Sequence, residues 1–412
     1  MTQKPEKATV GIGLSRKYEY ASVEAAMRAS LEPFGGMGAF VKPGQKVLLK
    51  VNLVAPSGPS LAVTTHPEVL RAAIRLVKEA GGIPFAGDGP GVGDTATAAR
   101  VSGLTEVLEA EGAQLLEFTE TAVYENLENT IAKKLALTAH LKDMDVLVTL
   151  PKLKTHCQMA FTGALKNQFG LIPGAAKGQF HFRFQNRARL ADLMIDINRT
   201  AHTALAIMDG IVGMEGPGPS GGTPREIGVI ISGPDLAAVD SVACDIIGLS
   251  PDDVPVSEAA RRAGYGVTSL ADIDVVGASL EELRICDYKL VKAPANIMRI
   301  VPLPKFMLRW LRAQMAPRPH IRQELCIKCR RCERGCPVKP AAISPMSPPG
   351  KQLNDSTCIR CYCCHEFCPV KAIDLKKSLL ARIVPFTALG NFGTKVLGWC
   401  CALFFRKGGR KS

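Results

Sequence analysis

Fourteen cysteines occur in the chain, and eight of them fall into two runs with the same spacing. The first run is Cys326, Cys329, Cys332 and Cys336, the second is Cys358, Cys361, Cys364 and Cys368, and a proline follows the last cysteine of each. Three thiolates, each separated from the next by two intervening residues, can surround one face of a four-iron, four-sulfur cluster. A zinc site needs only four ligands in paired hooks, so the spacing argues against zinc. The runs predict two [4Fe-4S] clusters and one-electron transfer.

This spacing is that of bacterial two-cluster ferredoxins, in which the fourth cysteine of each run ligates the other cluster. We therefore assign Cys326, Cys329, Cys332 and Cys368 to one cluster and Cys358, Cys361, Cys364 and Cys336 to the second. Cys363 has no place in the pattern and is interpreted as a bystander or a neighbour that tunes the cluster. Cations surround the first run, and positive charge is expected to raise the reduction potential there.

The formal net charge of +13 is concentrated near the C-terminus. Residues 288–323 and 375–412 contain eight cations each and no acid, whereas residues 1–287 are net acidic. Both segments are also rich in apolar and aromatic residues, which suits the surface of an anionic membrane. Prolines and glycines interrupt them before the roughly 20 apolar residues that a spanning helix needs. We expect either peripheral membrane contact or packing on the protein, and no nucleic-acid binding, because a recognition motif is lacking.

Length and composition predict a globular chain of several parts. They are an α/β domain at 1–287, a basic apolar linker at 288–323, a ferredoxin-like domain at 324–374 and a basic apolar tail at 375–412. No apolar segment of signal-peptide length follows Met1, so the sequence predicts a cytoplasmic protein, either free or at the inner face of the membrane.

Residues 1–287 alternate short apolar segments with amphipathic ones. Strands are predicted at 9–14, 46–53, 83–87, 145–150, 205–208, 227–232 and 273–277, and helices at 66–80, 186–200 and 236–247. Thr65 is expected to cap the first of these helices. The alternation predicts an α/β fold with a mainly parallel sheet and helices on both faces, next to a small α+β ferredoxin-like domain. Ligands of such sheets bind at the carboxyl ends of the strands.

Polar residues follow several of the predicted strands. Substrate-binding candidates are Lys50, Asn52, Asp88, Lys152, Lys154, Lys166, Asn167, Asp209 and Glu215, and catalytic candidates are His156 and His181. Lysines at strand ends would bind a carboxylate or phosphate, and a histidine can donate a proton. The alternatives are solvated surface lysines and structural histidines. With Asp240, the acidic candidates could instead hold a divalent cation or balance the lysines. The glycine-rich segments lack a dinucleotide or P-loop motif.

These motifs resemble a known family. The matching segments are Lys50-Val-Asn-Leu53, Thr65-His66-Pro67, Gly87-Asp88-Gly89, Pro151-Lys-Leu-Lys-Thr-His156, Gly163-Ala-Leu-Lys-Asn167, Asp209-Gly210 and Asp240 with its following helix. They are similar to the domain of unknown function 362, which is often fused to a two-cluster ferredoxin module. The resemblance covers about residues 8 to 275 and supports the domain layout. It implies no catalytic residue.

Two hypotheses follow from these observations. The first is an iron-sulfur oxidoreductase, in which two clusters exchange electrons with a small anionic substrate held by lysines of the α/β domain. The second is a non-catalytic electron carrier that docks to a membrane-associated redox partner protein through its basic segments. Salt would weaken docking of that kind.

Overall fold

The computed structural model describes residues 7–291 and 316–376, apart from 92, 175–176, 178–179, 181–182 and 185. The catalytic candidate His181 lies outside the described residues, and so does most of both basic apolar segments. No helix in the described ranges has the length and hydrophobicity to cross a membrane.

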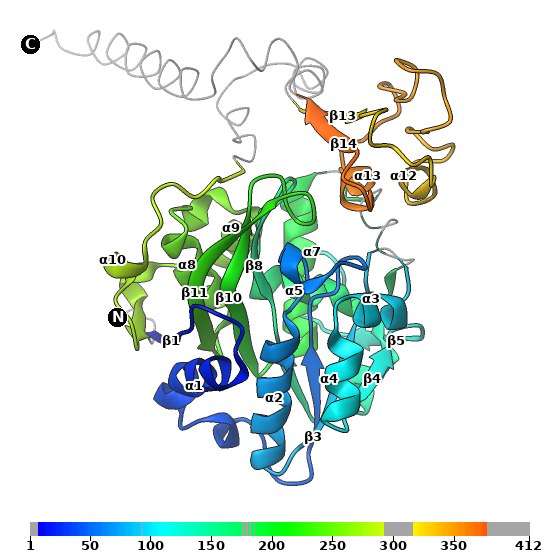
Figure 1. The fold of residues 1–412 in the computed structure, drawn as a ribbon. Helices are drawn as coiled ribbons and strands as arrows, with labels where there is room; N and C mark the ends of the chain where they lie inside the picture. Colours follow the sequence, from blue (N-terminus) through cyan, green and yellow to red (C-terminus); the bar gives the residue numbers. More distant parts are fainter. Residues whose placement is uncertain are drawn as a thin grey trace, which may run out of the picture.

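Within the described residues, a ten-stranded sheet forms the centre of the large unit (Figure 1). Eight strands lie side by side in the order β12-β1-β11-β10-β7-β2-β3-β4, while β8 pairs with β10, and β9 pairs with β8. Their bounds are β1 Ala8–Leu14, β2 Lys46–Lys50, β3 Ile83–Asp88, β4 Gln114–Glu117, β7 Val146–Thr149, β8 Lys152–His156, β9 Ala160–Thr162, β10 Leu205–Glu215, β11 Thr223–Gly233 and β12 Ile273–Val276. A separate hairpin pairs β5 (Thr121–Glu125) with β6 (Lys134–Thr138).

The sheet is mainly parallel. Strands β4, β3, β2, β7 and β10 run parallel to one another, as β1 and β12 do, whereas β11 is antiparallel to both β10 and β1. Four consecutive buried residues in β7, Val146–Thr149, are typical of a parallel strand that is covered on both faces. The predicted α/β fold is therefore confirmed.

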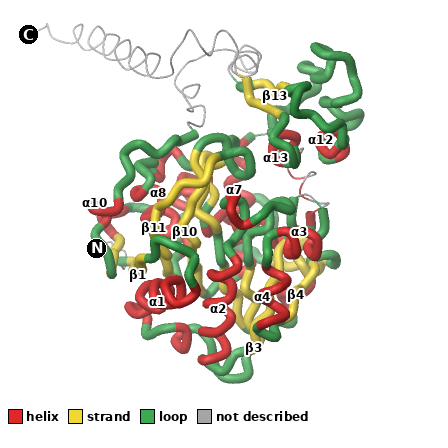
Figure 2. Tube along the Cα trace, in the orientation of Figure 1, coloured by secondary structure: helices red, strands yellow, loops and turns green. Residues whose placement is uncertain are grey.

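Helices cover both faces of the sheet (Figure 2). One apolar core includes residues of α1 (Tyr20–Leu31), α2 (Pro67–Glu79), α3 (Thr95–Val101) and α4 (Leu104–Ala110). The other includes residues of α5 (Ala164–Asn167), α7 (Arg187–Ala201), α8 (Leu236–Ile246) and α9 (Pro255–Ala263). Apolar residues recur in α2 at helical spacing, so one face is buried and the other carries charge.

The predicted cap of α2 is wrong by one residue. His66 occupies the cap position, and its Nδ1 accepts a hydrogen bond from the backbone N–H of Glu68 at 3.2 Å. Thr65 instead donates its hydroxyl to the carbonyl of Leu150 at 2.6 Å, which ties the start of the helix to the end of β7. The cap was assigned to threonine because histidine is not among the common capping residues.

The small unit contains two cysteine loops, and a pair of strands joins its ends. Strand β13 (Arg318–Ile321) pairs antiparallel with β14 (Ile373–Lys376), so the unit extends beyond the predicted range 324–374 on both sides. Helix α12 (Arg331–Arg334) follows the first loop, and α13 (Cys363–Glu366) follows the second. The small unit lies beyond the edge of the sheet, with α13 nearer to the large unit than α12 is (Figure 1).

Candidate functional site

The two cysteine loops have the same backbone conformation. Residues two and four positions after the first cysteine have positive φ in both: Lys328 (54°) and Arg330 (58°), then Arg360 (57°) and Tyr362 (63°). Non-glycine residues seldom adopt this conformation, and such residues gather at sites that need a particular backbone path. The internal duplication seen in the spacing is therefore also present in the fold.

The first group of thiols surrounds a small cavity. Its lining includes Cys326, Cys329 and Cys332 from the first run and Cys368 from the second. These are the four residues that the crosswise pattern assigns to one cluster. Burial raises the pKa of Cys332 to about 11. A bound cation is therefore needed to hold this thiol as a thiolate at neutral pH.

The second group of thiols packs beside the first. Cys336 and Cys364 are buried in the core of the small unit, and Cys358 packs against them. Burial, followed by the neighbouring thiols, raises the pKa of Cys364 well above its usual value. Two backbone groups donate to fourth-position sulfurs, Ala342 to Cys336 at 3.4 Å and Ala372 to Cys368 at 3.1 Å, and such N–H···S contacts tune cluster potentials.

The described side chains contain no group of three ligands that would hold a single metal ion. A four-iron cluster needs a wider arrangement of ligands, because each thiolate binds a different iron and the four sulfurs lie around the whole cluster. Four thiols around a cavity, and Cys358, Cys361 and Cys336 near Cys364, fit this arrangement. These residues can hold two clusters, which when bound accept and release electrons one at a time.

The small unit contacts the glycine-rich segment after β10. His365 places Nε2 3.1 Å from the carbonyl oxygen of Pro217, and the Ser220 hydroxyl donates to the carbonyl of Glu366 at 3.0 Å. An added Cβ on Gly221 would approach the His365 ring to 2.7 Å, so a side chain at this position would disturb the contact. The glycine-rich segment therefore serves as a docking surface within the chain.

A cavity of about 1070 Å³ lies between the two units. The α/β domain contributes Asn52, Asp88, His156, Lys166 and Asn167, and the small unit contributes Cys336, Cys363 and Glu366. Several of these α/β residues follow the carboxyl ends of strands, where ligands of parallel sheets bind. The cavity joins the predicted substrate residues to a predicted cluster ligand, Cys336.

Cations line the cavity from both sides. Lys166, Lys177 and Arg183 belong to the α/β domain, and Arg334 and Lys339 belong to the small unit. Burial lowers the pKa of Lys177 to about 8, against the attraction of Asp88. Burial lowers the pKa of Lys166 as well, against the attraction of Glu366, Cys363 and Asp88. An anion in the cavity would relieve the cost of these buried charges.

Two predicted substrate lysines are paired inside the domain instead. Lys50 Nζ lies 2.7 Å from Asp88 Oδ1, and Lys152 Nζ lies 2.8 Å from Asp209 Oδ2. Neither lysine lines the cavity, and their side chains are no more than 1% exposed. Burial would raise the pKa of Asp88, but the charges of Lys50 and Lys177 outweigh it and lower the pKa. These pairs fix the ends of the strands.

A chain of hydrogen bonds connects a third lysine to the cavity wall. Lys154 Nζ donates to Asn52 Oδ1 at 2.7 Å, and Asn52 Nδ2 donates to Asn167 Oδ1 at 2.8 Å. Burial lowers the pKa of Lys154 well below its usual value, and two neighbouring lysines lower it further. Lys154 therefore orients two amides that line the cavity.

His156 faces a carboxylate of the small unit across the cavity. Its Nδ1 accepts from the backbone N–H groups of Gln158 (3.0 Å) and Met159 (3.2 Å). The neutral ring therefore carries its proton on Nε2, which lies 3.4 Å from Glu366 Oε1. A histidine of the α/β domain thus meets a carboxylate that lies within the second cysteine run, between Cys364 and Cys368.

The acidic candidates do not gather into a cation site within the described residues. Asp88 and Asp209 balance buried lysines, and Glu215 pairs with Lys289 at 3.1 Å. Asp240 caps α5 by accepting from the N–H groups of Ala164 (2.5 Å) and Leu165 (3.1 Å), and burial raises its pKa to about 7. Asp240 therefore positions the short helix that carries Lys166.

Several residues of the cavity could not be selected from the sequence. Arg334, Lys339, Glu366 and Phe367 reach it only because the small unit folds back onto the sheet. Their sequence positions give one weak signal, since all lie within four residues of a predicted cluster ligand. Arg183 lies in a segment without a recognisable motif.

Comparisons with known proteins agree with this layout. A model of the family described as domain of unknown function (DUF362) matches residues 47–245. The thylakoid-associated protein sll1697 of Synechocystis is 37% identical over 283 residues, which are 68% of this chain and 87% of that protein.

Solved structures give weaker matches. They include the lactate racemase apoprotein of Thermoanaerobacterium thermosaccharolyticum, with 14% identity and a TM-score of 0.37. A Thermotoga maritima protein matches with 15% identity and a TM-score of 0.35. The first match covers 57% of this chain and 56% of the racemase, and the second covers 55% of this chain and 58% of the other protein. This chain thus spans little more than half the length of each solved protein.

Proposed function

The chain belongs to the DUF362 family, whose name assigns no chemistry, and we therefore propose its function from the candidate site. We propose that it transfers electrons through two [4Fe-4S] clusters to or from a small anionic substrate. One observation carries the proposal. Cys336, a predicted ligand of the second cluster, lines the same cavity as Lys166, Lys177 and His156. A ligand there would contact the electron-transfer unit and the cations at once.

Residues of this chain would divide the work in the cavity. Lys166 and Lys177 bind the anionic group, supported by Arg183, and the amides of Asn52 and Asn167 orient it. His156, with its proton on Nε2, donates or accepts a proton when the substrate gains or loses electrons.

Anaerobic purification tests the proposal. Iron and sulfide are measured first, with about eight of each expected per chain. The reduced protein is then mixed with single small carboxylates and phosphate esters, and its visible absorbance is followed. Reoxidation by one class of anion, and not by neutral analogues, is the expected result. Clusters that stay reduced with every anion tried would contradict the proposed substrate.

Anion affinity is expected to fall as pH rises through about 8, because the pKa of Lys177 is lowered to about 8 and the neutral amine attracts no anion. Calorimetric titration with inorganic phosphate at fixed pH values between 8 and 10 measures the effect, since the charge of phosphate is nearly constant in that range. Lys177→Arg should keep high affinity throughout, because arginine stays protonated. Affinity that is independent of pH in the unchanged protein would exclude Lys177 as a ligand.

A second candidate function is a non-catalytic electron carrier at a membrane. Two observations favour it: the name of the Synechocystis relative describes thylakoid association, and the basic apolar segments suit an anionic lipid surface. Flotation with anionic liposomes separates the two functions. Lipid binding that disappears when residues 379–412 are deleted supports docking to the membrane.

A further inference from the structure

The two cysteine repeats face different surroundings. Arg330 and Arg331 in the first repeat occupy the positions of Tyr362 and Cys363 in the second, four and five residues after the first cysteine. Tyr362 and Cys363 are 4% and 2% exposed, and Cys363 lines the cavity between the units. Arg330 and Arg331 are exposed. The two repeats therefore present equivalent faces. The α/β domain covers the face of the second repeat, whereas the face of the first repeat is exposed and is called the open face below.

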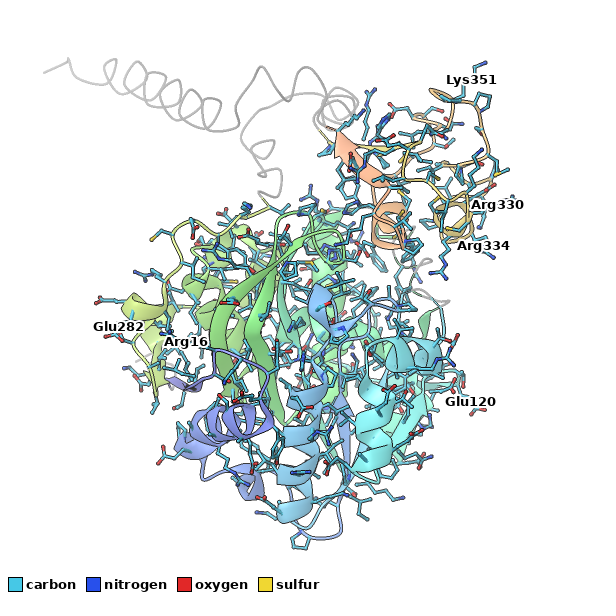
Figure 3. The ribbon with its side chains drawn as sticks, viewed as in Figure 1. Arg16, Glu120, Glu282, Arg330, Arg334 and Lys351 are labelled. Carbon is cyan, nitrogen blue, oxygen red and sulfur yellow. The ribbon has the colours of Figure 1, made fainter. Side chains whose placement is uncertain are left out.

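In the described part of the chain, the contacts of the open face are local ones. Arg330 pairs with Glu333 in the adjoining helix at 2.9 Å. Arg330 projects from the outer side of the small unit (Figure 3), whereas Arg334 lines the cavity between the units. Nothing in the described part of the chain covers this face as the α/β domain covers the second repeat.

The open face combines apolar side chains with positive charge. Ile327 and Leu325 are 62% and 41% exposed, which is unusual for large aliphatic residues so close together. Three exposed cations, Lys328, Arg330 and Arg331, are close to them in the sequence, together with two acids, Glu324 and Glu333. Transient protein interfaces combine exposed apolar residues with a surface charge that is complementary to the partner.

The same residues lie directly over the first group of thiols. Ile327, Arg330 and Arg331 line the cavity that Cys326 and Cys329 also line. A bound protein would thus bring its own redox centre close to these thiols. A lipid surface offers the same apolar and anionic chemistry but no electron donor or acceptor.

We infer that this open face, formed by Leu325, Ile327, Lys328, Arg330 and Arg331, docks an acidic one-electron carrier protein. The inference rests on the clusters of the proposed function. At each encounter one electron passes from the reduced carrier to the thiolate-bound centre, so the carrier is oxidised as this chain is reduced, and no bond forms or breaks. Electrons would enter at the first cluster and leave from the second, whose predicted ligand Cys336 lines the substrate cavity.

Binding of an acidic plant-type ferredoxin in its oxidised form tests the docking surface. Calorimetric titration at low and at physiological ionic strength is made with full-length protein of measured iron and sulfide content. Lys328→Glu with Arg331→Glu should weaken the complex about tenfold or more at low salt and reduce its salt dependence. Ile327→Ser should weaken it by a smaller factor and leave the salt dependence unchanged.

Lys351→Glu is the control, because Lys351 is exposed on the same unit but lies away from Arg330 of the open face (Figure 3). It should change the affinity less than about twofold. An equal loss with Lys351→Glu would mean attraction by overall charge and would overturn the docking site. Iron-loaded protein that does not bind the ferredoxin would also overturn it, as would anionic vesicles that compete for this face. Protein without iron would contradict the proposed function instead.

Discussion

A chain with Cys326→Ala and Cys368→Ala is expected to keep one cluster, whereas a chain with Cys326→Ala and Cys336→Ala is expected to keep none. Cys368 lines the same cavity as Cys326, so the first pair removes two ligands from one site. The second pair removes one ligand from each site, because Cys336 is absent from the lining of that cavity and acts on the buried thiol of Cys364 in the other group. Both variants lose two buried or partly buried thiols from the same unit and are therefore matched.

Iron analysis after anaerobic purification measures the result. The unchanged protein should contain about eight irons, the first variant about four, and the second close to none. Magnetic coupling between two reduced clusters in the electron paramagnetic resonance spectrum should appear only in the unchanged protein. If each cluster were bound within its own run, the results would be reversed: the pair Cys326 and Cys336 would then spare one cluster, and the pair Cys326 and Cys368 would remove both.

The sheet was predictable because its strands are short apolar segments between amphipathic helices. Seven predicted strands correspond to β1, β2, β3, β7, β10, β11 and β12. Strand β8 was missed because its sequence, Lys152–His156, is polar, and only the completed fold buries all five residues. Its lysines are buried beside Asp209 and Asn52, and these partners lie far away in the sequence. Propensity and periodicity carry no information about such pairs.

The site was predictable only in part, for a related reason. The rule that ligands bind at strand ends selected Asn52, Asp88 and Lys166, which all line the cavity. The same rule also selected Lys50, which is equally close to a strand end but points into a salt bridge. The opposite wall comes from a separate unit, and the docking of two units depends on tertiary contacts that no local pattern specifies.

Lys50→Met is expected to lower the free energy of unfolding of the α/β domain by about 3–5 kcal/mol, because it leaves Asp88 buried without its ion-pair partner. Lys166→Met removes a lysine whose charge is opposed by burial and attracted by Glu366, so the two effects should offset each other and change stability little. The same variant should weaken binding of inorganic phosphate about tenfold, since a charge-assisted hydrogen bond is lost. Lys50→Met is thus expected to lower stability, whereas Lys166→Met is expected to lower phosphate affinity.

Urea unfolding followed by circular dichroism gives the stability of each variant, and calorimetric titration of folded protein gives the affinity. Lys50→Met combined with Asp88→Leu is the control for the buried pair, because removing both charges should restore much of the lost stability. Equal loss of phosphate affinity in well-folded Lys50→Met would place Lys50 among the ligands after all. Unchanged affinity in Lys166→Met would leave the cavity without its main anchor, and the anion would then have to bind through Lys177 and the cations of the small unit.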